Sequence, residues 1–144
     1  MSPSTVTTLA DAVVDVLNTL EFSQTFTAER AYVPKFDLAE MKDLRVTVVP
    51  KRVVSQALDR SRSQFEYDID VGVQKKLQNL ENNGIDDLVA LAEEIADQFR
   101  RQRPSAFPSA ICLKAEVQPV FAQEHLDELR QFTSVVTLTF RIAR

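Results

Sequence analysis

The chain has 144 residues, of which 44% are hydrophobic and 26% charged, and its formal net charge is -4. This length suits a single domain, residues 1–144, that buries its own core, and no apolar run approaches the ~18 residues needed to span a bilayer. The acidic balance argues against a protein whose main task is to grip nucleic acid, but it is compatible with a surface that DNA slides past.

Cysteine, histidine and glycine are scarce. Cys112 is the only cysteine and His125 the only histidine, so an intramolecular disulfide is excluded and a cysteine/histidine zinc site would need a second subunit. We expect Cys112 to be a buried structural thiol in a strand. With only Gly72 and Gly84, the chain has no Gly-rich phosphate loop. We expect residues 1–8 to be a polar lead-in rather than a secretory signal.

The first half of the chain begins with an amphipathic helix predicted over residues 8–20, where apolar side chains recur at helical spacing. A β-favouring stretch, 22–33, predicts a strand that a proline ends. Residues 35–43 predict a helical turn in a crossing loop. Residues 44–49 predict a second strand, which we expect Pro50 to close.

The third predicted strand, residues 65–73, has the most informative pattern in the chain. Strand periodicity places five apolar side chains on one face and three acids on the other. The acids are Glu66, Asp68 and Asp70, and the apolar residues are Phe65, Tyr67, Ile69, Val71 and Val73. Since the strand itself supplies no opposite charge, this row must meet water, cations of a neighbouring strand or another molecule.

A basic arm, residues 51–64, precedes this strand. Its charged residues are Lys51, Arg52, Arg60 and Arg62 against Asp59 alone. It is expected to be a turn of helix or the base of a long hairpin, and segments of this kind are often functional. The alternative is a solvated loop whose charges keep the protein in solution.

The second half predicts a helix over 85–99, with Asp86 and Asp87 in its first turn and arginines crowding its end before Pro104. Strands are predicted at 111–121 and 135–143, joined by a polar excursion at 123–131 with helical character. The expected fold is therefore α+β: a mainly antiparallel sheet of about five strands with two amphipathic helices on one face, in the order α-β-β-β-α-β-β.

Candidate chemistry in this sequence is sparse. Asp68 and Asp70 share a strand face about 7 Å apart and, with Glu66, form the only metal-site candidate, but hard cations usually need ligands from several converging elements. His125 lies in a polar run and is expected at the surface rather than in a catalytic pair. We therefore expect no catalytic residue, no metal site and no cofactor.

Several segments resemble the tail terminator, or tail-completion, proteins of tailed bacteriophages. They read FTAERAYVP at 26–34, DLAEMKDLRVTVVP at 37–50, YDIDVGVQKK at 67–76 and FTSVVTLTFR at 132–141. The resemblance implies a non-enzymatic virion subunit that forms a ring, typically sixfold. The ring caps the tail tube and meets the neck or head-completion protein around a channel for DNA. It also implies assembly in the host cytoplasm, a final place at the tail-neck junction, and no membrane partner.

On this resemblance, Lys51, Arg52, Arg60 and Arg62 are expected to contact a neighbouring subunit or the tail-tube end. Glu66, Asp68 and Asp70 are expected to line the channel or a seam between subunits, and DNA would pass without sequence-specific binding. Three alternatives stay open: another neck protein such as a head-tail stopper or adaptor, a small metal-dependent nuclease using Asp68 and Asp70, and a non-viral adaptor domain.

Overall fold

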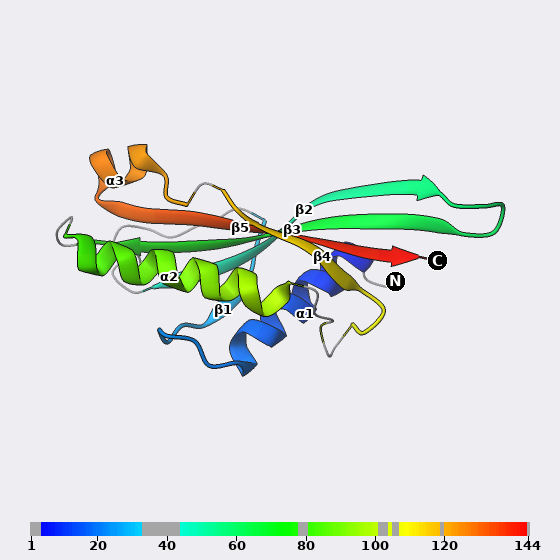
Figure 1. Cartoon of the computed structure of the whole chain (residues 1–144), viewed down its shortest axis with the longest axis horizontal. Coiled ribbons are helices and arrows are strands. Elements are labelled where there is room, and N and C mark those ends of the chain that lie inside the picture. The colour runs from blue at the N-terminus through cyan, green and yellow to red at the C-terminus, as the bar shows by residue number, and fades with distance from the viewer. Residues whose placement is uncertain are drawn as a thin grey trace.

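A computed structural model describes residues 4–32, 44–77, 81–100, 104, 107–118 and 120–143. Within these residues five strands form one sheet in the order β1-β2-β3-β5-β4. The sheet is mixed, because β1 runs parallel to β2 whereas the other neighbours are antiparallel. Helices α1 and α2 lie against one face and α3 lies on the other side, at one end of β5 (Figure 1). The predicted α+β class and element order are confirmed, with a third helix added.

Helix α1 spans Thr5–Thr19, three residues earlier at its start than predicted. Ser4 caps it, since its side chain accepts a hydrogen bond from the backbone N–H of Thr7 at 3.2 Å. The predicted apolar stripe is buried and contacts β1 and β2, whereas Leu20 lies outside the helix and is exposed.

The strand predicted at 22–33 is wrong for most of its length. Only Ala28–Arg30 pairs, as β1, and residues 20–27 form a loop that returns from α1. Asn18 fixes this return, because its side chain donates to the carbonyl of Ala28 at 3.2 Å and accepts from its N–H at 2.7 Å. Aromatic residues in this loop raise β propensity but serve packing instead. The helical turn predicted at 35–43 lies outside the described residues.

Strands β2, Arg45–Ala57, and β3, Ser63–Lys76, form a long hairpin. The prediction that Pro50 closes the second strand is wrong, since β2 continues for seven residues beyond it. The register shifts between Pro50 and Arg52, and β1 pairs with β2 only as far as Val48. Proline is tolerated in a strand at such a bulge or along an edge. The basic arm is thus the outer part of a hairpin rather than a turn of helix.

Helix α2 spans Asn82–Phe99 and buries the predicted stripe against β4 and β5. It begins earlier than predicted, so Asp86 and Asp87 lie beyond its first turn, which contains no acid. Arg100 is the C-cap residue and pairs with Asp97 at 2.8 Å. The prediction that Asp86 and Asp87 lie in the first turn, where they would suit the positive end of the helix dipole, is therefore wrong. Arg101 and Arg103 lie outside the described residues.

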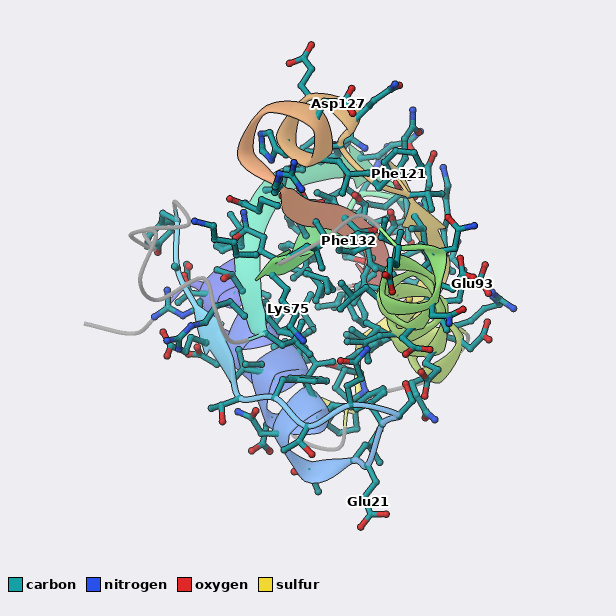
Figure 2. All side chains as sticks on the ribbon, turned by 90° about the vertical axis from the view of Figure 1, so that its left-hand side faces the viewer. Glu21, Lys75, Glu93, Phe121, Asp127 and Phe132 are labelled. Carbon is teal, nitrogen blue, oxygen red and sulfur yellow. The ribbon has the colours of Figure 1, made fainter. Side chains whose placement is uncertain are left out.

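Strand β4 is Ile111–Val117, helix α3 is Gln123–Leu129 and strand β5 is Gln131–Ala143. The apolar face of β5 is buried, and Phe140 meets Phe99 of α2 edge-on with ring centroids 6.4 Å apart. Figure 2 shows Phe132 inside this core, while Glu21, Glu93 and Asp127 project outward. The apolar row of β3 lies in the same core, as predicted, with Phe65 at its half-buried margin.

Candidate functional site

The acidic row of β3 lies on the sheet face away from α1 and α2, and its partners are cations of β2. Arg52 Nε lies 2.9 Å from Asp68 Oδ2, and Lys51 Nζ lies 3.5 Å from Asp70 Oδ2. The other oxygen of each carboxylate accepts a hydroxyl hydrogen bond from β5: Thr139 donates to Asp68 at 2.9 Å and Thr137 to Asp70 at 2.7 Å. The sequence left open whether the acidic row meets water, cations of a neighbouring strand or another molecule. For Asp68 and Asp70, cations of a neighbouring strand are confirmed.

The bulge in β2 makes this double pairing geometrically feasible. Adjacent residues of a regular strand point to opposite faces, so Lys51 and Arg52 would otherwise diverge. Here the register shifts between Pro50 and Arg52, and the extra residue brings both cations to the polar face. The two carboxylates are mostly buried, with side chains 11% and 20% exposed for Asp68 and Asp70. The basic and acidic groups predicted as separate contact surfaces thus form one cluster.

The paired residues border a groove of about 560 Å³ on the polar face. On its far side β4 contributes Lys114 and Glu116, whose charged groups lie 3.3 Å apart. The residues that line the groove are Lys51, Arg52, Asp68, Lys114, Glu116, Gln118, Thr137 and Thr139.

The part of the polar face around the groove carries balanced charge. Glu66 pairs in register with Arg141 of β5, and among the described residues neither has an ion pair within 4.0 Å. Around the groove, four cations (Lys51, Arg52, Lys114 and Arg141) lie on the same face as four acids (Glu66, Asp68, Asp70 and Glu116). The acidic row of β3 is therefore not an acidic wall, because neighbouring strands supply compensating charges around it.

Arg60 and Arg62 lie far from this cluster, in the turn of the hairpin. Asp59 organises the turn: its Oδ1 accepts from the backbone N–H groups of Ser61 and Arg62, both at 2.9 Å. These hydrogen bonds lower the pKa of the Asp59 carboxyl, and the one from the N–H of Ser61 has the largest effect. Arg62 also pairs with Asp59 at 3.3 Å, whereas Arg60 has no ion-pair partner among the described residues. Four cations predicted to act together thus divide into two structural groups.

Asp68, Asp70, His125 and Cys112, which were considered for metal binding or catalysis, have structural partners or are buried. Within the described part of the chain, no three His, Cys, Asp or Glu side chains converge as metal ligands would. His125 is half-buried rather than exposed, and its Nδ1 lies 2.8 Å from Thr133 Oγ1. Cys112 is buried as predicted, and burial raises the pKa of its thiol to about 11. Such a thiol is a poor nucleophile at neutral pH.

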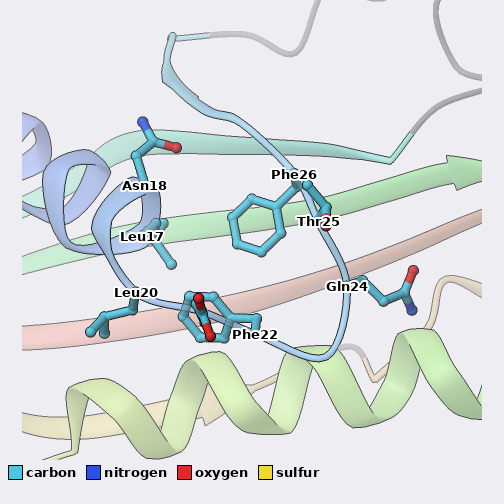
Figure 3. A pocket seen from close by; sticks show the side chains of 8 residues that line it. Leu17, Asn18, Leu20, Phe22, Gln24, Thr25 and Phe26 are labelled. Atoms are coloured by element: carbon cyan, nitrogen blue, oxygen red, sulfur yellow. The ribbon is translucent and has the colours of Figure 1, made fainter.

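A separate pocket of about 310 Å³ lies at the end of α1, bordered by the loop that returns to β1 (Figure 3). The rings of Phe22 and Phe26 lie 5.4 Å apart in this loop. Glu94 of α2 anchors the loop by accepting hydrogen bonds from the N–H of Ser23, at 3.0 Å, and from its hydroxyl. The contacts around this pocket pack the loop against α1 and α2.

The sequence did not identify Thr137, Thr139, Lys114 and Glu116 as site residues. The signal that could have identified the threonines is the alternation in the sequence of β5, which puts Thr137, Thr139 and Arg141 on one polar face. Their contacts with Asp68 and Asp70 depend on the register between β3 and β5, which alternation leaves undetermined.

The ion-paired polar face and the exposed outer part of the β2–β3 hairpin are thus the two surface features that distinguish this α+β domain. Comparison of the chain with protein-family models and with curated protein sequences gives no match in either. In the described residues, none of the helices is both long and apolar enough to cross a membrane.

Proposed function

We propose that the protein is a structural subunit of the tail-terminator type, which assembles into a ring, caps the tail tube and joins it to the neck around a DNA channel. The observation that carries this proposal is the outer part of β2 with the hairpin turn, where every residue from 51 to 62 is exposed and, among the described residues, no strand pairs with the outer edge of β2 beyond Val48. An exposed strand edge of this length is expected in a chain whose partners complete it. The sequence resemblance supplies the identity of those partners.

The polar face suits the wall of a channel or a seam between subunits. Lys51 and Arg52 are already paired with Asp70 and Asp68, so they have little free charge with which to bind phosphate. A neutral wall lets DNA pass because non-specific affinity depends on cations that neutralise phosphates. In this proposal Lys51 and Arg52 stabilise the face, and the contact with a neighbour or the tube belongs to the hairpin turn with Arg60 and Arg62.

The direct experiment mixes the purified protein with tubes polymerised from the tail-tube protein of the same phage and inspects the tube ends by electron microscopy. Rings at tube ends, and arrest of further polymerisation, are the expected result. The Arg60→Glu/Arg62→Glu variant should fail to cap, whereas Lys76→Glu, at the opposite end of β3, should cap normally. Bare tube ends with the folded wild-type protein would reject the proposal.

The same experiment separates the nearest alternative. A head-tail stopper or adaptor would also form a ring, but it would leave tail tubes uncapped and bind the head or neck complex instead. A chain that remains a monomer at the highest attainable concentration, and also in the presence of tubes, would instead be an adaptor domain.

A further inference from the structure

The hairpin has apolar side chains on both of its uncovered faces. Val53 and Val54 are successive residues of β2, so they point to opposite sides, and they are 49% and 41% exposed. Leu58, at the start of the turn, is 48% exposed. These apolar side chains on the outer part of β2 and at its turn are exposed to solvent, and a partner that covers them would bury apolar surface.

The turn is held in one conformation before any partner binds. The N–H of Leu58 donates to the carbonyl of Arg62 at 3.0 Å, and the Asp59 carboxylate holds the N–H groups of Ser61 and Arg62. Arg60 lies at the apex, without an ion-pair partner among the described residues. A preorganised turn loses little conformational entropy when it docks.

Charge distinguishes the hairpin from the rest of the molecule. Residues 51–64 contain four cations and one acid, a net charge of +3, which leaves the other residues with thirteen cations and twenty acids, a net charge of -7. A second copy therefore attracts the hairpin to its body, and charge complementarity of this kind steers association.

The body offers a matching groove between α2 and β4. It has a volume of about 270 Å³ and is lined by Glu93, Ala96, Asp97, Arg100, Ala115 and Val117. Its alanine and valine side chains are apolar, and Glu93 projects from α2 without an ion-pair partner among the described residues (Figure 2). The groove lies beside β4, which is an edge strand of the sheet. An edge strand has unpaired backbone groups that can accept another strand.

A chain cannot dock its own hairpin into this groove. The turn lies at one end of the molecule and most of α2 extends toward the other end (Figure 1). We propose that the hairpin turn of one copy docks in the α2–β4 groove of the next, with Leu58 against the apolar lining and Arg60 beside Glu93. Because donor and acceptor surfaces differ, the contact is head-to-tail and generates a ring when the rotation closes. This docking contact rests on the proposed ring and specifies the interface between its subunits.

Reciprocal charge reversal tests this contact. Arg60→Glu and Glu93→Lys, each alone, should weaken assembly ~10-fold or more per interface, as measured by sedimentation velocity or native mass spectrometry. An equimolar mixture of the two variants should assemble again, because each hairpin then finds a groove of opposite charge. Mixed rings alternate and therefore close only with an even number of subunits. The double variant in a single chain should also assemble.

Lys76→Glu makes the same charge change away from both surfaces and should assemble like the wild type. Recovery in the mixture excludes misfolding as the cause of each single defect. Wild-type assembly by either single variant, a mixture no better than its components, or a wild-type chain that remains monomeric would overturn the inference. If Arg60→Glu still forms rings that cap tubes, this interface is wrong and the proposed function stands. If reciprocal reversal restores assembly but no ring caps a tube, this interface stands and the proposed function is wrong.

Discussion

Removal of the two carboxylates that pair with Lys51 and Arg52 should increase the affinity of the polar face for DNA. In Asp68→Asn/Asp70→Asn each side chain keeps an oxygen that accepts the hydroxyl of Thr139 or Thr137. The substituted amide presents a donor to Arg52 and Lys51 in place of a charged acceptor. The cations are therefore released while the hydroxyl contacts are retained.

The structure gives a magnitude for this change. Two cations are freed per subunit, and each additional phosphate contact on duplex DNA adds ~0.9 to the slope of log affinity against log salt. The salt dependence should therefore steepen by up to about 2 per subunit, and more in an assembled ring. The cost in stability should be small, about 1 kcal/mol for both pairs together, because Arg52 and Lys51 are more than half exposed.

Fluorescence anisotropy with a labelled duplex, over a range of salt concentrations, measures the salt dependence of DNA affinity. Urea denaturation measures the loss of stability. Thr137→Val/Thr139→Val is the matched control, since it removes the hydroxyl donors and leaves every charge in place. It should lower stability without any gain in DNA affinity. An unchanged salt slope in the Asn variant, or an equal gain in the Val control, would refute the claim that ion pairing keeps this face from binding DNA.

Four further predictions concern the fold. Asn18→Ala should lower the free energy of unfolding by about 1–3 kcal/mol, since both backbone groups of Ala28 lose their partner; an unchanged urea midpoint would contradict this. Thr47→Val should raise stability by about 1 kcal/mol, because the buried Thr47 hydroxyl has no hydrogen-bond partner in the described part of the chain; a lower melting temperature would refute it. Gly72→Ala should be tolerated and add up to about 1 kcal/mol, since its Cβ would meet only the Thr47 carbonyl at 3.8 Å; thermal unfolding decides. Burial raises the pKa of Cys112 from 9.0 to about 11. The neutral buried thiol therefore contributes roughly 2–3 kcal/mol to the free energy of unfolding, and this contribution is complete below pH 9 and is lost as pH rises to 11. Cys112→Ala should lack that loss in urea titrations over this range.

Periodicity in the sequence predicted which faces of β3, β5, α1 and α2 are buried, because alternation and helical spacing are local properties of each segment. It did not predict the partners of the acidic row. Those partners depend on a bulge after Pro50, and a proline at the end of an apolar run reads equally well as the end of the strand. Once β2 is taken to stop there, Lys51 and Arg52 belong to a loop, and their distance from Asp68 and Asp70 cannot be deduced.

In the aromatic loop after α1, the sequence predicted a strand that the structure does not have, whereas β2 was predicted too short. Phe22 and Phe26 have high β propensity, but propensity in strands mostly reflects packing on a half-buried surface. Here that packing is available in a loop, where the two rings meet each other and Glu94 anchors the chain through Ser23. The side chain of Asn18 then delays the start of β1 to Ala28. Local composition could not distinguish these outcomes, since Glu94 is 71 residues from Ser23.

The hairpin itself is an argument for assembly that does not depend on resemblance. The outer part of β2 is an edge strand, and unpaired strand edges with apolar side chains promote indiscriminate pairing. Natural proteins protect such edges with charge, bulges or proline, and this one combines Pro50, a bulge and flanking cations. Yet Val53, Val54 and Leu58 remain exposed beyond that protection. Their exposure lowers the solubility of a free monomer, and it is offset if a partner of opposite charge covers them in one defined orientation.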